Sequence, residues 1–117
     1  MKKSLQELDD ILIEFEKDNW IAPTSLKGRT RHITLHITKL LGKLAAISEK
    51  WEHGFDDEAA VIEIKDGIAP DLLGYALMLA RIHNFDLEAA FLERLEANKR
   101  KVQGWKDKKQ VKELPKF

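Results

Sequence analysis

Lys43 and Tyr75 stand at equivalent places in two apolar segments, LLGKL and LLGYA, each directly after a glycine. Both segments have the apolar spacing of a helix. A glycine inside a helix costs about 1 kcal/mol relative to alanine, and it usually allows another backbone to approach closely. We therefore expect the two helices to touch at Gly42 and Gly74, with Lys43 and Tyr75 beside the same cleft.

A lysine beside that cleft can hold a phosphate group, because its ammonium is a compact point charge. Three residues of a later helix, Arg94, Asn98 and Lys101, are spaced by four and three and so share one face, where they can supply further donors. Trp20, in the segment before the second helix, can stack on a base. Together these side chains offer donors to a phosphate-bearing ligand.

An ordinary structural role for the same residues is the alternative. In that interpretation Lys43 pairs with Asp71 across the helix contact, while Leu72 and Tyr75 fill the cleft as core. The sequence is compatible with both interpretations.

Other side chains with catalytic potential lack the partners that the chemistry needs. His32 and His36 are four residues apart, a spacing that can bind a metal, but no third ligand stands nearby and we expect a partly exposed helix face. The chain has no cysteine, which excludes disulfides, thiolate zinc sites and cysteine nucleophiles. None of the three serines lies in a nucleophile motif.

Composition favours one helical domain with a solvated surface. Of 117 residues, 44% are hydrophobic and 34% charged. The absence of cysteine, of a long apolar run and of a signal-like N-terminus predicts a cytoplasmic protein without a membrane partner. We expect a helical domain over residues 1–105 and a basic tail over 106–117. The tail lacks interleaved aromatic residues, so nucleic acid is not the expected partner, although the tail could bind a polyanion.

Apolar residues recur at helical spacing almost throughout, and strand patterns are nearly absent. Ser4 and Glu7 form a capping box that predicts the start of the first helix. Gly54 is expected to end the second helix, and Asp56 or Asp57 to cap the next. Further helices are expected over about 29–51 and over the short segment 57–65. Another should run from Pro70 to the HNFD turn, and the last from an Asp86 cap to a stop at Gly104. A loop is expected at 19–28 and a turn at DGIAPD. The pattern predicts an all-α, antiparallel four-helix bundle that is completed by dimerisation.

The segment LLGKL, followed by DLLGYALMLARIHNFDLEAAFLERLEANKRK, resembles the MazG-like, all-alpha nucleotide pyrophosphohydrolases. That family carries E-E-x-G-E-L on one helix and E-L-G-D on the next long helix. A helix with basic residues and an asparagine near its end follows. The resemblance covers the chain from about Trp20 to Trp105, and it implies the MazG-like form of the helical bundle.

In that family, four acids hold magnesium ions, which bind the nucleotide phosphates and activate a water molecule. This chain has none of the four. Leu40 and Lys43 stand where the second acid of the first segment and the acid after its glycine belong. Leu72 and Tyr75 replace the glutamate and aspartate of the second segment.

The additional acid at the start of each family segment aligns with Lys39 and Asp71, so only Asp71 keeps an oxygen ligand. Removing four carboxylates from a two-metal site abolishes metal affinity, because groups that only hydrogen-bond to the ligands cannot replace ligands that are missing. The resemblance therefore implies a catalytically degenerate homologue, a homodimer without a metal cofactor that acts as a nucleotide-binding or protein-interaction module. Its candidate ligand residues are Lys39, Lys43, Asp71, Tyr75, Arg94, Asn98, Lys101 and Trp20.

An active enzyme with relocated carboxylates is the main alternative. Glu49 and Glu52 form a literal E-x-x-E, and Glu63 and Asp66 a literal E-x-x-D. With Asp71 they could bind magnesium, the cofactor that this alternative requires. Their surroundings differ from the family segments, since one pair lies in a polar last turn and the other runs into a glycine.

Overall fold

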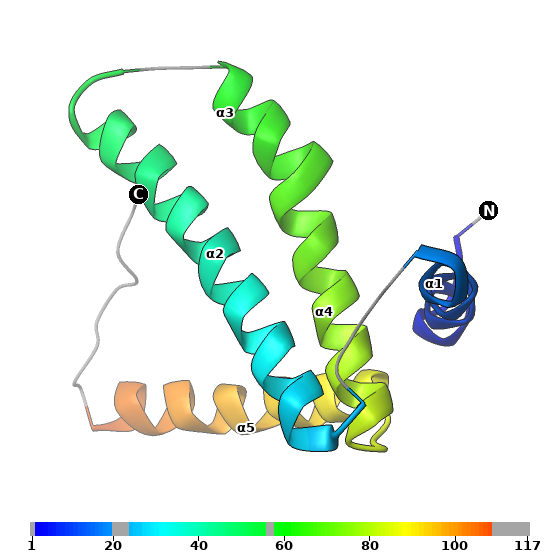
Figure 1. The fold of residues 1–117 in the computed structure, drawn as a ribbon. Helices are drawn as coiled ribbons and strands as arrows, with labels where there is room; N and C mark the ends of the chain where they lie inside the picture. Colours follow the sequence, from blue (N-terminus) through cyan, green and yellow to red (C-terminus); the bar gives the residue numbers. More distant parts are fainter. Residues whose placement is uncertain (1, 20–23, 56–57, 109–117) are drawn as a thin grey trace. The chain divides into compact units, whose positions relative to one another are not determined.

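The computed structural model describes residues 2–19, 24–55 and 58–108, and every regular element in these ranges is helical (Figure 1). The elements are α1 (Leu5–Asn19), α2 (Leu26–Glu52), α3 (Glu58–Glu63), the π-helix η1 (Ile64–Ile68), α4 (Ala69–Ile82) and α5 (Leu87–Asp107). The predicted all-α class is confirmed for these residues, whereas the antiparallel bundle and its dimerisation stay predictions. Two compact units divide the chain, Met1–Asn84 and Phe85–Phe117. None of the described helices is both long and apolar enough to span a membrane.

The first helix begins where its capping box predicts. The Glu7 amide donates to Ser4 Oγ at 3.1 Å, and the Ser4 amide donates to Glu7 Oε1 at 3.1 Å. Each bond satisfies an amide at the helix start that has no partner within the helix. The local sequence alone therefore fixes the start of α1 at Leu5.

The second helix begins three residues before the expected start at Arg29, at Leu26. Ser25 is its N-cap, and Ser25 Oγ accepts from the Gly28 amide at 3.0 Å. Gly28 therefore lies in the first turn and not in the preceding loop. A serine cap stabilises a helix start by about 1 kcal/mol, which offsets the cost of one glycine.

The second helix ends as predicted. Gly54 has a φ of +84° and follows the C-cap residue His53. Its amide donates to the Trp51 carbonyl at 3.0 Å, one of the carbonyls that the helix end leaves unsatisfied. The caps predicted at Asp56 and Asp57 lie outside the described residues.

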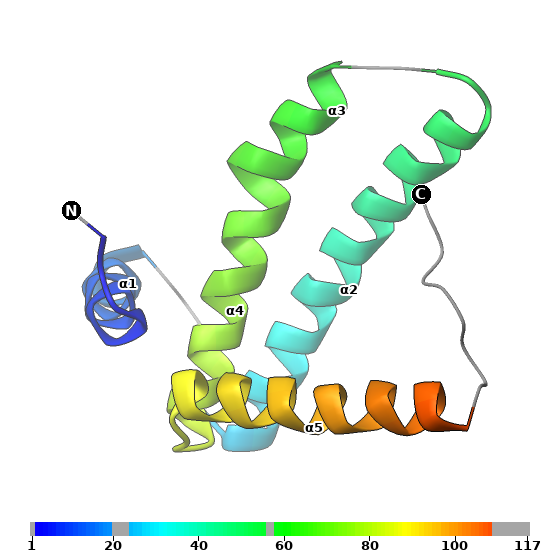
Figure 2. The same cartoon turned by 180° about the vertical axis from the view of Figure 1, so that it is seen from behind.

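The turn predicted at DGIAPD is wrong, because α3, η1 and α4 follow one another without a break from Glu58 to Ile82 (Figure 2). In η1 the helix widens, and the Ala69 amide donates to the carbonyl of Ile64, five residues earlier. Proline in a regular helix clashes with the carbonyl four residues before it and has no amide to bond to it. The wider π turn beside Pro70 removes this conflict, so the chain passes through the proline as helix.

The core of the first unit lies between α2 and the continuous α3–η1–α4 helix, which run side by side (Figures 1 and 2). Ile68 in η1 is only 2% exposed, and it packs with the buried side chains of Leu40, Ile47 and Ala60. Burial of one such large side chain contributes roughly 1.5–3 kcal/mol. Four half-buried side chains pack against this core: Leu44, Ile64, Leu72 and Tyr75. These eight residues form the Ile68 cluster.

The N-terminal end of α2 is joined to the C-terminal end of α4 by Thr30 and His83. Thr30 Oγ1 donates its proton to the Leu26 carbonyl at 2.9 Å and lies 2.9 Å from His83 Nε2. Which of the two atoms donates depends on the tautomer of His83. This bond holds one end of the α2–α4 pair together.

The second unit contains α5, which begins at its predicted cap. Asp86 Oδ1 accepts from the Ala89 amide at 3.1 Å. The stop predicted at Gly104 is wrong, since the helix continues to Asp107. Gln103 Nε2 donates to Asp107 Oδ1 at 2.9 Å, and this side-chain bond, one turn apart, supports the helix beyond the glycine.

Candidate functional site

The glycines inside α2 and α4 do not mark a close helix contact, so that expectation is wrong. A Cβ atom added at Gly42 or Gly74 would meet no other atom of the described chain within 4 Å, the helix's own nearby backbone apart. The two helices pack instead through larger side chains of the Ile68 cluster, among them Leu40 and Leu72. Large side chains fill the space between helices, and the glycines are left facing open space.

Lys43 and Tyr75 therefore have different surroundings. Tyr75 is half-buried and, like Leu72, belongs to the Ile68 cluster, in which Leu40 is 7% exposed. Lys43 is exposed, and among the described residues it makes no ion pair with Asp71, which is exposed in the first turn of α4. Three of the four positions where the family's acids belong thus lie in one apolar cluster, and the fourth presents an ammonium group to solvent.

A stacked pair of rings joins Tyr75 to His36 of α2, with 5.5 Å between the ring centroids and 21° between the planes. His36 also meets His32 edge to face, at 4.5 Å. Burial raises the pKa of the Tyr75 phenol, and the negative charge of Asp71 one turn earlier raises it further. Tyr75 therefore stays a neutral phenol well above neutral pH.

Basic residues line one flank of α2, and no acid occurs over residues 26–48. Spacings of three and four residues place them in a line along the helix. This line, the cationic flank, consists of Arg29, His32, His36, Lys39 and Lys43. A surface with one sign of charge and no counter-charges on its own helix attracts anions.

The remaining predicted ligand residues lie elsewhere in the chain. Arg94, Asn98 and Lys101 are exposed on α5, in the second unit, where the helical register places them on one face. Trp20 and most of the predicted basic tail lie outside the described residues. Lys39 and Lys43 lie on α2 and Tyr75 lies on α4, and these two helices pack side by side.

The acids of the relocated-site alternative are exposed and spread over four elements, with Asp71 on α4. Glu49 and Glu52 lie near the end of α2, Glu63 ends α3, and Asp66 lies in η1. Asp66 lies 3.4 Å from the ammonium nitrogen of Lys65. In the part of the chain that the structure describes, no three His, Asp or Glu side chains lie close enough to hold a metal ion.

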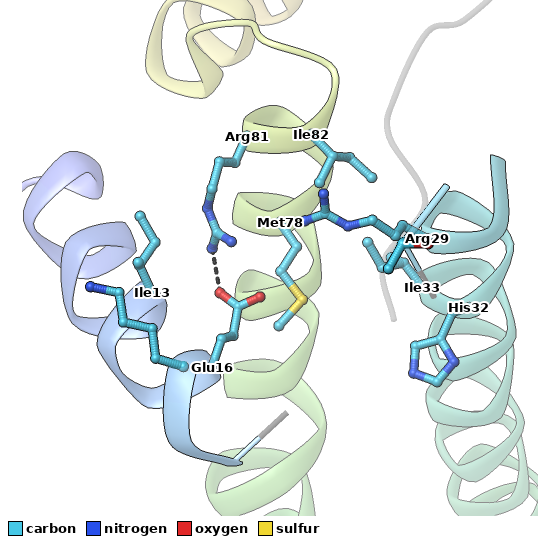
Figure 3. A pocket seen from close by; sticks show the side chains of 10 residues that line it. Ile13, Glu16, Arg29, His32, Ile33, Met78, Arg81 and Ile82 are labelled. Carbon is cyan, nitrogen blue, oxygen red and sulfur yellow. Dashed lines mark ion pairs between the residues drawn. The ribbon is translucent and has the colours of Figure 1, made fainter. Parts of the chain in front are cut away.

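A groove of about 460 Å³ lies between α1, α2 and α4 (Figure 3). Apolar side chains from all three helices line it: Ile13, Ile33, Met78 and Ile82. Its polar lining consists of Glu16, Lys17, Thr24, Arg29, His32 and Arg81. This groove, the α1 groove, combines apolar walls with a few charged groups, which is the usual composition of small-molecule sites.

Arg81 closes the α1 groove on the side between α1 and α4. Its guanidinium donates to Asp9 Oδ1 at 2.8 Å and lies 2.7 Å from Glu16 Oε2, an ion pair that lacks hydrogen-bond geometry. Burial lowers the pKa of Arg81, but the hydrogen bonds to Asp9 and the negative charges of Asp9 and Glu16 outweigh burial and hold the pKa above its ordinary value. Arg81 therefore stays charged and fastens α1 to α4.

The sequence-based predictions did not find the α1 groove. Asp9 and Arg81 are 72 residues apart, and no local pattern links them. Arg29 was assigned only to a helix start. One sequence signal could have drawn attention to Arg29: it lies in the long stretch of α2 without an acid, so no carboxylate lies within one helical turn of it.

Scans against protein-family models, and searches of curated proteins and of solved structures, find no match for this chain. The resemblance to MazG-like proteins rests on the sequence segments LLGKL and DLLGYALMLARIHNFDLEAAFLERLEANKRK alone. A function must therefore be argued from the geometry of the chain itself.

Proposed function

We propose that this chain is a MazG-like homologue that has lost metal-dependent hydrolysis and binds a nucleotide through its phosphates without a metal ion. The observation that carries the proposal is the Ile68 cluster. Leu40, Leu72 and Tyr75 occupy three of the family's acid positions and pack together as core. The fourth position, Lys43, offers a cation where the family has an anion.

The chemistry of these side chains argues against a magnesium site at this place. Magnesium requires hard oxygen ligands in octahedral geometry. Leucine side chains have no donor atom, and Tyr75 has a raised pKa, so its oxygen stays protonated. The ammonium of Lys43 would repel a divalent cation.

The cationic flank supports phosphate binding. Lys39 and Lys43 are exposed at its C-terminal end, and the first 23 residues of α2 contain no acid that could pair with them. His36, which precedes Lys39 by three residues on the same flank, stacks on Tyr75 of α4.

A thermal-shift series tests the proposal. Nucleoside triphosphates should raise the melting temperature equally with magnesium and with a chelator, because a ligand that binds only the folded state stabilises it. The variant Lys43→Ala should lose this shift. Lys27→Ala is the matched control, since Lys27 is an exposed lysine of α2 outside the cationic flank. A shift that survives in Lys43→Ala, or that requires magnesium, contradicts the proposal.

An assay of pyrophosphate release from nucleoside triphosphates with magnesium tests the alternative of relocated carboxylates. The proposal predicts no turnover above that of buffer. Turnover that disappears in Glu52→Gln or Glu63→Gln would show that these acids hold the metal and that the chain is an enzyme. Both residues are exposed, so neither substitution should unfold the protein.

Self-association is a second candidate role, favoured by the large apolar side chains that the first unit leaves exposed. Each of these is more than two-fifths exposed: Leu35, Leu41, Val61, Ile62 and Leu73. Oligomer interfaces bury side chains of this kind. Sedimentation velocity at micromolar concentration should give twice the 13.5 kDa chain mass. A sedimenting species of 13.5 kDa would exclude the homodimer at that concentration.

A further inference from the structure

Among the residues that the structure describes, the charged side chains that line the α1 groove have a partner of opposite charge except at Arg29. Arg81 has two carboxylate partners, and Lys17 pairs with Glu14 at 2.9 Å. Arg29 makes neither an ion pair nor a side-chain hydrogen bond to another residue in the described ranges. Figure 3 shows its side chain extending from α2 toward α4, above Met78. The groove therefore has one guanidinium without a counter-charge.

The rest of the α1 groove is apolar and contributed by three helices. Ile13 comes from α1, Ile33 from α2, and Met78 and Ile82 from α4 (Figure 3). Ile33 and Met78 are almost fully buried and form its floor. A volume of about 460 Å³ is within the range of small-molecule sites, roughly 300–1,000 Å³.

We infer that the α1 groove binds a small amphiphilic anion, with one carboxylate or phosphate head on Arg29 and an apolar body over Met78. Charge complementarity supports an anion, because the uncompensated group is a cation. The planar fork of arginine accepts a carboxylate or a phosphate through two parallel hydrogen bonds. The apolar walls exclude a bare inorganic ion as the best ligand, since such an ion would leave them in contact with water.

This site is separate from the proposed nucleotide site. Arg29 and Lys43 are 14 residues apart on α2, which corresponds to about 21 Å along the helix axis. A small ligand cannot reach both ends of the cationic flank. The inference therefore does not depend on nucleotide binding, and each site can be removed without the other.

Methyl NMR of the full chain offers a direct test, because the sequence contains only two methionines. Met78 lines the groove, whereas the signal of Met1 serves as the internal reference. Benzoate and phenyl phosphate are the probes, one for each head group, and benzyl alcohol is the neutral control. At least one anion should shift the Met78 methyl signal in a saturable way, with benzyl alcohol binding at least tenfold more weakly.

Two arginine variants assign the head-group contact. Arg29→Gln should weaken binding of the anionic probe at least tenfold, the effect of losing a charge-assisted hydrogen bond of about 1.4 kcal/mol or more. Arg31→Gln makes the same charge change on an exposed residue of α2 that does not line the groove, and it should change affinity less than twofold. Lys43→Ala should likewise leave benzoate and phenyl phosphate binding unchanged.

Three results would each overturn the inference. They are the absence of a saturable Met78 shift with either anion, equal binding of benzyl alcohol, and equal losses in Arg29→Gln and Arg31→Gln. Binding of only one anion identifies the head group as carboxylate or phosphate. The Met78 signal of each unliganded variant, compared with that of the parent chain, shows directly whether the groove is still folded.

Discussion

Arg81 on α4 and Asp9 on α1 face each other as a fork: Nη2 donates to Oδ1 at 2.8 Å, and Nε donates to Oδ2 at 3.3 Å. The side chains are only 24% and 13% exposed, and α1 has no fully buried residue of its own. This contact should therefore hold α1 in place. Arg81→Gln should lower the free energy of unfolding by about 2 kcal/mol, because it removes bonds to a charged group and leaves carboxylates without a cation. Urea denaturation measures the loss.

An exposed ion pair provides the control for this prediction. Lys65 and Asp66 lie 3.4 Å apart, and their side chains are 82% and 61% exposed. Lys65→Gln should cost less than about 0.5 kcal/mol, since solvent screens such pairs. If Arg81→Gln costs no more than Lys65→Gln, the fork contributes nothing to the attachment of α1.

The sequence predicted well those features that depend on a few neighbouring residues. The capping box at Ser4, the cap at Asp86 and the glycine that follows α2 at Gly54 are all confirmed. Each depends on backbone groups within four residues, so the local sequence contains all the information needed. The helical spacing of the apolar residues likewise indicated the all-α class without knowledge of the tertiary structure.

Predictions that depended on a single glycine or proline were less reliable. The helix start predicted near Pro70 is confirmed, since α4 begins at Ala69, but the turn predicted before it is wrong because η1 joins α3 to α4 without a break. Gly104 was taken as a stop, but the bond between Gln103 and Asp107 supports another turn. At Gly104 the residue's own preference was outweighed by a bond that its neighbours make.

Pairings between distant residues were not predictable at all. The sequence contains Asp9 and Arg81, but nothing in the pattern near either residue indicates the other. The alternative interpretation of Tyr75 as core is found in the structure, whereas its pairing of Lys43 with Asp71 is not. The burial of an apolar side chain can be predicted from composition and helical spacing, but an ion pair between distant residues can be predicted only when the fold is known.

The chain has one tyrosine, so tyrosinate absorbance at 295 nm reports Tyr75 alone. Its pKa should exceed the ordinary 10.0 in the folded protein and return to that value in urea. A phenol with a raised pKa in the folded state contributes stability below about pH 10, and this contribution is lost as pH rises through the folded pKa. Tyr75→Phe should therefore reduce the loss of stability above pH 10.

A second substitution tests the cause of the Tyr75 shift. Asp71→Asn removes the smaller contribution, the charge of Asp71, and should lower the pKa of Tyr75 only in part, because burial is the larger cause. The same 295 nm titration measures it. An unshifted pKa of Tyr75 in the folded parent chain would contradict its packing against the Ile68 cluster.

Acids placed where the MazG-like family carries them should differ in their cost at two positions of α2. Leu40→Glu places a carboxylate in the Ile68 cluster, where Leu40 is 7% exposed, and should cost at least about 3 kcal/mol of unfolding free energy. Lys43→Glu changes an exposed side chain and should cost less than about 0.5 kcal/mol. Equal stability of both variants would show that the Leu40 position can accommodate a charge and that a metal site could be rebuilt there.

Alanine substitutions at the two helical glycines test whether another backbone approaches them. In the isolated chain a Cβ at Gly42 or Gly74 meets open space among the described residues, so each substitution should raise the free energy of unfolding by about 0.5–1 kcal/mol through helix propensity. Gly54→Ala is the control with the opposite sign, because Gly54 has a φ of +84° that alanine adopts poorly. Thermal and urea unfolding at two protein concentrations measure all three. A concentration-dependent destabilisation by Gly42→Ala or Gly74→Ala would mean that a second copy of the chain packs against that glycine.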